Sequence, residues 1–209
     1  MEIAHIGLDV PENFPDVVID KITTDIQSSG LKVKVNKHKT SVMAAALDWV
    51  LPTAIAAYVF KPYFESFLQE AGKDHYKMLK SWLKKFANDG RAIKVYRITA
   101  SQSTQKNIDN DDQSRSVSIL LQTKNGKIIK LLFNDSMTQE DWNNAIEQLL
   151  DFALEHYEKF PNDRLSSVLE ELETERSAWV YAIIDKTSKQ LQFYNDSDLI
   201  KLHREQSEK

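Results

Sequence analysis

The sequence contains no cysteine, which excludes thiolate catalysis, zinc sites built on thiolates and disulfide bonds. Glycine and proline occur only five times each in 209 residues, so the chain has the composition of a folded protein. The five glycines are too widely spaced to form a glycine-rich phosphate loop. The chain does not start with a basic segment leading into an apolar one. We therefore expect no secretory signal and a cytoplasmic location.

The charge of the chain is unevenly distributed. Residues 1–30 carry one lysine against six acidic residues, residues 31–94 carry twelve Lys or Arg against five, and residues 95–209 carry fourteen against twenty. A basic middle third between two acidic segments has two interpretations. It either docks on the acidic remainder of its own chain or attracts an acidic partner or anionic lipid from outside.

Hydrophobic periodicity predicts an α+β fold. Residues 2–10 and 31–35 alternate as strands around a helix that ends at Gly30, and this β-α-β start favours a parallel pair. Residues 117–133 and 179–195 read as antiparallel hairpins, each followed by a helix. The prediction is an N-terminal β-α-β unit, a central helical segment and C-terminal antiparallel hairpins packed with helices. A boundary near Gly90 separates 1–90 from 91–209, unless both join one continuous domain.

The central segment, from Thr40 to Asn88, has helical spacing. We expect one helix from about Ser41 that breaks at Pro52. A second helix begins at Pro62 and ends at Gly72, and a third runs from Asp74 to Asn88.

The stretch Val42–Phe60 is apolar at 16 of its 19 positions. It has three interpretations: a membrane span, a segment lying on a membrane surface, or part of a folded core. Asp48 and Pro52 oppose a span, because a carboxylate is costly in hydrocarbon and proline interrupts a helix. The core is the most general explanation of a segment that is apolar on all sides.

The helix expected over 74–88 carries a lysine stripe. On a helical wheel three of its lysines and the lysine just before it fall within about a 60° sector, opposite a face of Trp, Phe and Leu. This is the composition of a helix lying in a lipid headgroup layer. It is also that of a surface helix whose lysines face water. The stripe consists of Lys73, Lys77, Lys80 and Lys84.

The first functional hypothesis is a small non-enzymatic binding protein. Its contact surface would be the basic-apolar region 41–88, offered to a partner protein or to an anionic membrane surface on the inner side of the membrane. By size and style the chain fits a bacterial component of immunity or defence type. Nucleic acid is disfavoured as a partner because the chain is acidic overall. The expected contact residues are Trp49, Tyr58, Tyr63, Trp82 and the lysine stripe.

The alternative hypothesis is a hydrolase-like enzyme. His75 would act as acid or base, with Asp74 or Asp48 as the carboxylate, in a pocket between the two regions. A hydrogen-bonded structural histidine is the simpler interpretation of His75. The five histidines are isolated from one another, so the sequence predicts no metal site, and it predicts no cofactor.

Overall fold

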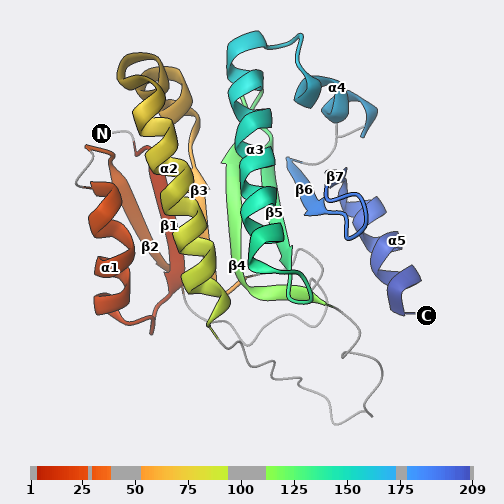
Figure 1. Ribbon diagram of the computed structural model, residues 1–209, viewed down its shortest axis with the longest axis horizontal. Helices are drawn as coiled ribbons and strands as arrows, with labels where there is room; N and C mark the ends of the chain where they lie inside the picture. Colours follow the sequence, from red (N-terminus) through yellow and green to blue (C-terminus); the bar gives the residue numbers. More distant parts are fainter. Residues whose placement is uncertain (1–3, 28–29, 39–52, 94–111, 173–177, 208–209) are drawn as a thin grey trace.

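The computed structural model describes residues 4–27, 30–38, 53–93, 112–172 and 178–207, with the side chains of 66–73 and 203–207 left aside. These residues form a seven-stranded mixed sheet of order β2-β1-β3-β4-β5-β6-β7 with helices packed on it (Figure 1). The strands are β1 (Ile6–Pro11), β2 (Val33–His38), β3 (Ile55–Val59), β4 (Gln113–Gln122), β5 (Ile128–Asn134), β6 (Trp179–Ile184) and β7 (Leu191–Tyr194). The helices are α1 (Asp16–Gln27), the π-helix η1 (Tyr63–Phe67), α2 (Leu68–Arg91), α3 (Gln139–Lys159), α4 (Arg164–Glu171) and α5 (Asp196–Ser207).

The sheet is built from three parallel pairs. β1 pairs with β2, β3 with β4 and β5 with β6, and each pair is connected in sequence through a helical segment. Antiparallel contacts between β1 and β3, β4 and β5, and β6 and β7 join these pairs and add the last strand. The predicted α+β class and the parallel β1–β2 pair are therefore confirmed.

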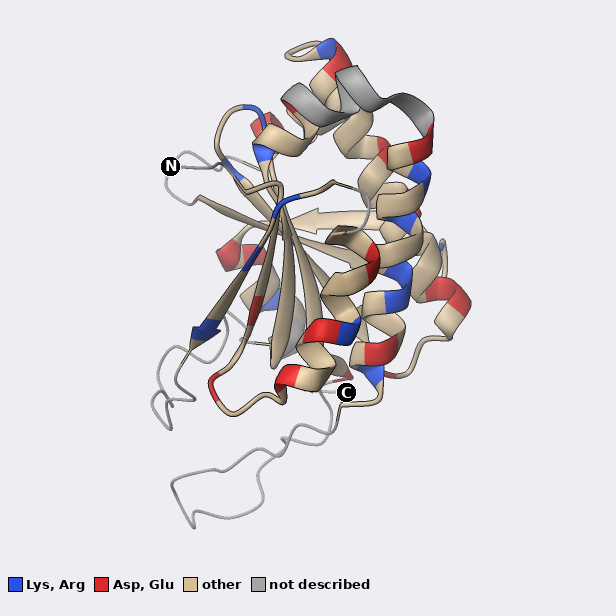
Figure 2. Ribbon diagram, turned by 90° about the vertical axis from the view of Figure 1, so that its left-hand side faces the viewer, with Lys and Arg blue, Asp and Glu red and all other residues tan. Residues whose placement is uncertain are grey.

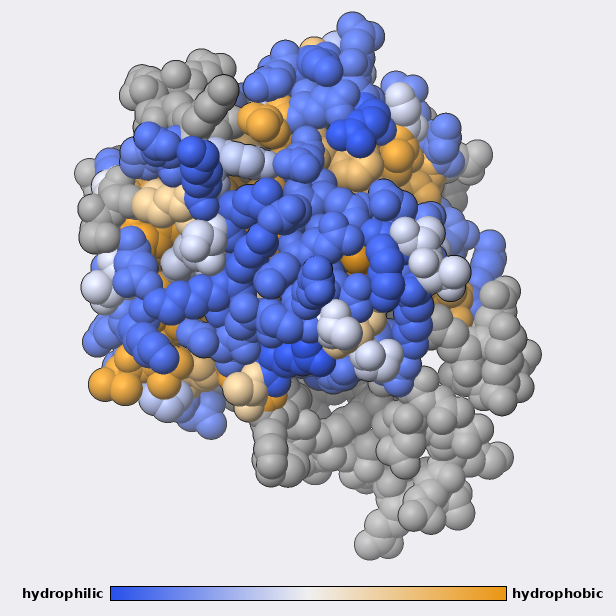
Figure 3. All heavy atoms as spheres, viewed as in Figure 1, coloured by the Kyte–Doolittle hydropathy of each residue, from blue (hydrophilic) through white to orange (hydrophobic). Residues whose placement is uncertain are grey.

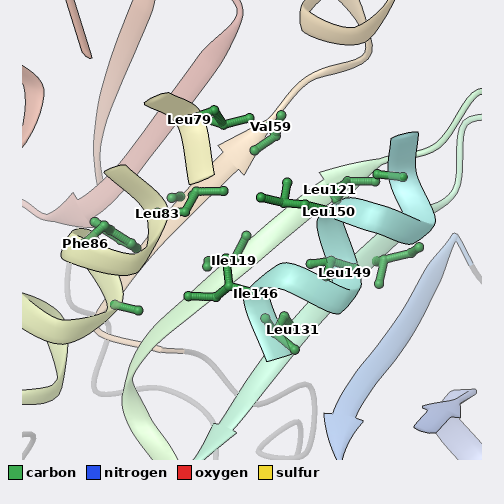
Figure 4. Packing of buried hydrophobic residues seen from close by; sticks show 14 of the residues in the cluster. Val59, Leu79, Leu83, Phe86, Ile119, Leu121, Leu131, Ile146, Leu149 and Leu150 are labelled. Carbon is green, nitrogen blue, oxygen red and sulfur yellow. The ribbon is translucent and has the colours of Figure 1, made fainter. Parts of the chain in front are cut away.

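The main core lies between the sheet and α1, α2 and α3, which all cover the same face (Figure 1). We call this the helix face and the opposite one the second face. Strand residues such as Val59 and Ile119 meet Leu83 of α2 and Leu149 of α3 across this layer (Figure 4). All four are fully or almost fully buried, and burying one such side chain contributes about 1.5–3 kcal/mol.

The second face is partly covered by α5. Leu199 of this helix packs with Leu132 of β5 and Tyr181 of β6, all buried, in a smaller cluster separate from the main core. Leu131, the neighbour of Leu132, belongs to the main core, because successive side chains of a strand point to opposite faces.

The predicted helix over the apolar run is wrong for the part that the structure describes. Residues 55–59 form β3, a central strand with β1 on one side and β4 on the other. A strand that is buried on both faces reads as a continuous apolar run, so it resembles a buried helix in sequence. Residues 42–52 of the run lie outside the described part. For residues 55–59, the core interpretation is confirmed, with Ile55, Ala57 and Val59 at 1% exposure or less.

The predicted break at Gly72 is also wrong. The chain runs from η1 into α2 without interruption as far as Arg91. A glycine within a helix costs only about 1 kcal/mol. Burial of Leu79, Leu83 and Phe86 against the sheet exceeds that cost.

The C-terminal predictions hold more closely. β4 and β5 form the expected hairpin around Gly126, whose φ of 88° is a conformation that favours glycine. Thr138 caps α3 in a reciprocal pair with Asp141. β3 and β4 lie on opposite sides of the boundary predicted near Gly90, so the two predicted regions share one sheet.

Candidate functional site

Two aromatic residues expected on the contact surface lie inside the protein. Tyr63 is fully buried, and Trp82 is only 5% exposed. The Trp82 indole stacks on Phe86 and donates its N–H to the carbonyl oxygen of Ile22 in α1, at 2.7 Å. The placement of these two rings toward a partner is therefore wrong, because both stabilise the packing of α2 instead.

The lysine stripe contacts the neighbouring helix. Lys80 and Lys84 both pair with Glu147 of α3, and their side chains are only 26% and 27% exposed. Hydrogen bonds from Lys84 and Lys80 hold the pKa of Glu147 below its ordinary value against the opposing effect of burial. Lys77 is 74% exposed and lies 3.6 Å from the Asp74 carboxylate. Half of the predicted stripe thus joins α2 to α3.

The same pattern accounts for the uneven charge of the chain. Lys85 of α2 pairs with Asp25 of α1, and Lys37 of β2 pairs with Asp16 at 2.6 Å. Figure 2 shows acidic residues of α1 beside basic residues of α2. Four of the twelve Lys and Arg residues of the basic middle third therefore dock on acidic segments of their own chain, which is the first of the two interpretations.

The residues of the enzyme hypothesis are not brought together by the described part of the structure. Asp74 is 94% exposed and its carboxylate is directed to Lys77, while His75 is half-buried on the same helix. The carbonyl oxygen of His75 accepts a hydrogen bond from Tyr63. Asp48 and Trp49 lie outside the described residues, as does the side chain of Lys73.

A buried Asp-His-Ser group occurs elsewhere, but it is structural. His156 is completely buried, its Nδ1 is 3.0 Å from Asp163, and its Nε2 accepts the backbone N–H of Lys124. The lone pair of Nε2 is occupied by the Lys124 N–H, so the ring proton is on Nδ1, where it faces Asp163. Ser166 approaches this protonated Nδ1, which cannot take the proton of its hydroxyl group. Asp163 caps α4 through Ser166. The group holds α3, α4 and the β4–β5 turn together.

On the second face, one residue from each of the seven strands lies in a single row across the sheet. The pairings place these residues side by side: Lys34, Gly7, Tyr58, Leu120, Lys130, Tyr181 and Tyr194. Tyr58 stacks on Phe60, and a side chain at Gly7 would meet that Phe60 ring at 3.0 Å. Burial and the nearby Asp9 raise the pKa of Tyr58.

Lys130 lies near the middle of this row and is only 7% exposed. Burial, assisted by the positive charge of Arg115, lowers the pKa of its amine to about 8. Lowered lysine pKa values occur in catalytic sites, but they also occur wherever a lysine is buried for packing. Its strand neighbours Leu120 and Tyr181 are buried as well, so this part of the row is interior rather than a binding surface.

At the β2 end of the sheet the side chains are exposed again. Asn36 donates a hydrogen bond to Asp9 at 2.7 Å, and His38 Nδ1 lies 3.4 Å from the same carboxylate oxygen. Lys34 is exposed on this face, and it has no acidic partner among the residues that the structure places. These polar groups lie together because the parallel β1–β2 register brings residues about 27 positions apart side by side.

β2 is an end strand of the sheet, and four consecutive residues of it, 34–37, are exposed. The carbonyl oxygens of Lys32 and His38 accept hydrogen bonds from Ile6 and Glu12, so even-numbered residues direct their backbone groups to β1. The odd-numbered residues Val33, Val35 and Lys37 therefore direct their N–H and C=O groups away from it. No described strand pairs with this outer edge. It is a template for one further strand.

The opposite end of the sheet is less available. β7 is only four residues long, and its first N–H, that of Leu191, donates to the Gln148 side chain of α3. Lys189, just before β7, has its carbonyl oxygen occupied by Asn144 and Gln148. Short length and side-chain caps are devices that protect a sheet edge from further pairing.

The sequence contains part of the signal for the β2 edge. The alternation over 31–35 predicts the strand, and its lysines are visible, but nothing local says that β2 lies at the end of the sheet rather than in its middle. The order of the strands, which decides this, depends on long-range pairing.

Comparison with models of known families, with curated proteins and with solved structures found no match for this chain. Within the described ranges, no group of three or more His, Asp and Glu residues is placed to hold a metal ion. The same ranges contain no helix with the length and apolar character needed to cross a membrane.

Proposed function

We propose that this is a non-catalytic binding protein that takes up an extended segment of a partner protein at the outer edge of β2. The observation that carries the proposal is the exposed run 34–37 on an end strand with outward backbone groups at Val33, Val35 and Lys37. Strand addition of this kind uses main-chain hydrogen bonds for affinity and alternate side chains for specificity.

A protein segment is favoured over a membrane surface. Binding to lipid through region 41–88 requires apolar side chains that face outward, but Tyr63 and Trp82 are buried. The surface over α1–α3 is mostly hydrophilic with only scattered apolar spots (Figure 3). A sheet edge, in contrast, recognises polypeptide backbone and offers nothing comparable to a lipid.

The test uses a phage library of random eight-residue peptides selected on the full-length protein. Val35→Pro removes one outward N–H, and proline is tolerated on an edge strand where the N–H faces solvent. We expect the selected peptides to bind this variant at least tenfold more weakly. Circular dichroism shows whether the variant remains folded, and Lys34→Glu provides a second edge variant that leaves the backbone unchanged.

The matched control is Lys77→Glu, which changes an exposed lysine of the predicted helical stripe. It leaves peptide affinity unchanged if the edge is the site. Selected peptides that bind both edge variants as tightly as the wild type contradict the proposal. Binding to vesicles of phosphatidylserine and phosphatidylcholine that is lost in Lys77→Glu, but not in the edge variants, supports the helical surface in its place.

A further inference from the structure

The side chains beside the β2 edge define the chemistry of the segment that fits it. We infer that the partner segment is a strand in which acidic residues alternate with apolar ones. This inference rests on the proposed function, because it assigns a partner to the same edge. A strand added beside β2 continues the alternation of the sheet, so its side chains alternate between the second face and the helix face.

On the second face the edge is basic. Lys34 is exposed there without an acidic partner in the described ranges, and its neighbours Asn36 and His38 are both directed to Asp9. Lys32, also exposed, precedes the strand on the same face. A carboxylate directly opposite a lysine on a neighbouring strand stabilises the pairing, and a like charge destabilises it. Acidic side chains are therefore favoured on this side.

On the helix face the edge is apolar. Val33 packs against the main core and Val35 is 36% exposed, one of the few large apolar side chains in the described part with that much exposure. Lys37 lies on the same face but is paired with Asp16 of α1. Apolar side chains of an added strand would cover Val35 here, and removing this apolar surface from water favours binding.

A second copy of this chain is a poor occupant of the edge. Pairing β2 with β2 of another molecule brings two sets of Lys32, Lys34 and Lys37 onto one short ladder. Lysines on an edge strand disfavour such self-pairing, and the same charges attract an acidic strand. The charge of the edge therefore discriminates against a second copy of this chain and in favour of an acidic partner.

The experiment measures the binding of three labelled eight-residue peptides to the full-length protein by fluorescence anisotropy. The first alternates Glu and Val, the second alternates Lys and Val, and the third has four Glu followed by four Val. At 50 mM NaCl we expect the first to bind at least tenfold more tightly than either of the others. Lys34→Glu weakens this binding at least fivefold, raised salt weakens it too, and Lys77→Glu leaves it unchanged.

The outcomes separate this inference from the proposed function. Equal affinity for the Glu/Val and Lys/Val peptides, with both lost in Val35→Pro, overturns the acidic preference while strand addition stands. If the peptide with four Glu followed by four Val binds as tightly as the alternating Glu/Val peptide, the inferred alternation is wrong. If none of the three binds although library peptides sensitive to Val35→Pro do, the inferred composition is wrong. If library peptides are insensitive to Val35→Pro, the proposed function itself fails.

Discussion

At the scale of single residues, Lys130 shows the cost of an ionisable group inside a sheet. Its pKa near 8 means that the folded protein binds this proton more weakly than the unfolded chain, where the ordinary value is 10.5. Below pH 8 the amine is charged in both states, and burial destabilises the fold by a constant amount. Between pH 8 and 10.5 the unfolded chain binds more protons, so the free energy of unfolding rises with pH.

We therefore expect Lys130→Met to raise the free energy of unfolding by about 1–3 kcal/mol at pH 7. The difference from the wild type should shrink as the pH is raised from 8 to 9.5, because the wild-type lysine loses its charge. Urea unfolding at several pH values measures both effects. Lys77→Met, at an exposed position, serves as the control and should show neither. A stability difference that grows with pH is incompatible with a lowered lysine pKa.

Sequence periodicity could place single residues only on a face, not against a neighbour. The helical wheel put Trp82 beside the apolar arc, which agrees with its burial, but gave no sign that Ile22 would accept its hydrogen bond. Likewise the stripe of lysines was visible, whereas its partner Glu147 lies 63 residues from Lys84. Such pairs depend on how two helices dock, and the local sequence pattern does not determine this docking.

At the scale of elements, α2 and β3 show the limits of local signals. The side of α2 that packs on the sheet is strongly apolar, and β3 is apolar at all five of its positions. The composition of β3 suits a buried helix as well as a buried strand. Gly90 was expected just beyond a helix, but it lies inside the last turn of α2. An added Cβ there would meet Val117 Cβ at 2.8 Å. The sequence does not distinguish a glycine that ends a helix from one that permits close packing.

The two explanations for Gly90 predict opposite signs for Gly90→Ala. Helix propensity alone makes alanine more stable by up to about 1 kcal/mol. The contact with Val117 makes the variant less stable by about 1–3 kcal/mol, because α2 must move away from the sheet. Thermal and urea unfolding decide between them, with Ser81→Ala on the exposed side of α2 as a control that changes stability by less than about 0.5 kcal/mol. A stabilised Gly90→Ala protein refutes the packing explanation.

At the scale of the whole molecule, the sheet order determines which features are available for binding. Sequence reasoning identified the α+β class, the parallel β1–β2 pair and both hairpins, since these depend on local alternation and turn residues. It could not order the seven strands, so it directed attention to the helical region instead of the β2 edge. The charge asymmetry had the same ambiguity. Only the folded arrangement shows that Lys80, Lys84 and Lys85 are matched by acids of their own chain.

The proposed function requires the outer edge of β2 to be open in the free protein and paired in the complex. Amide hydrogen exchange, resolved by residue with NMR, measures this directly on the full-length chain with and without a library-selected peptide. Before binding, we expect slow exchange at Lys34 and Asn36, whose N–H groups face β1, and fast exchange at Val33, Val35 and Lys37. Peptide binding should slow exchange at these three residues at least tenfold. Unchanged exchange there, with new protection on α2 instead, would contradict the account.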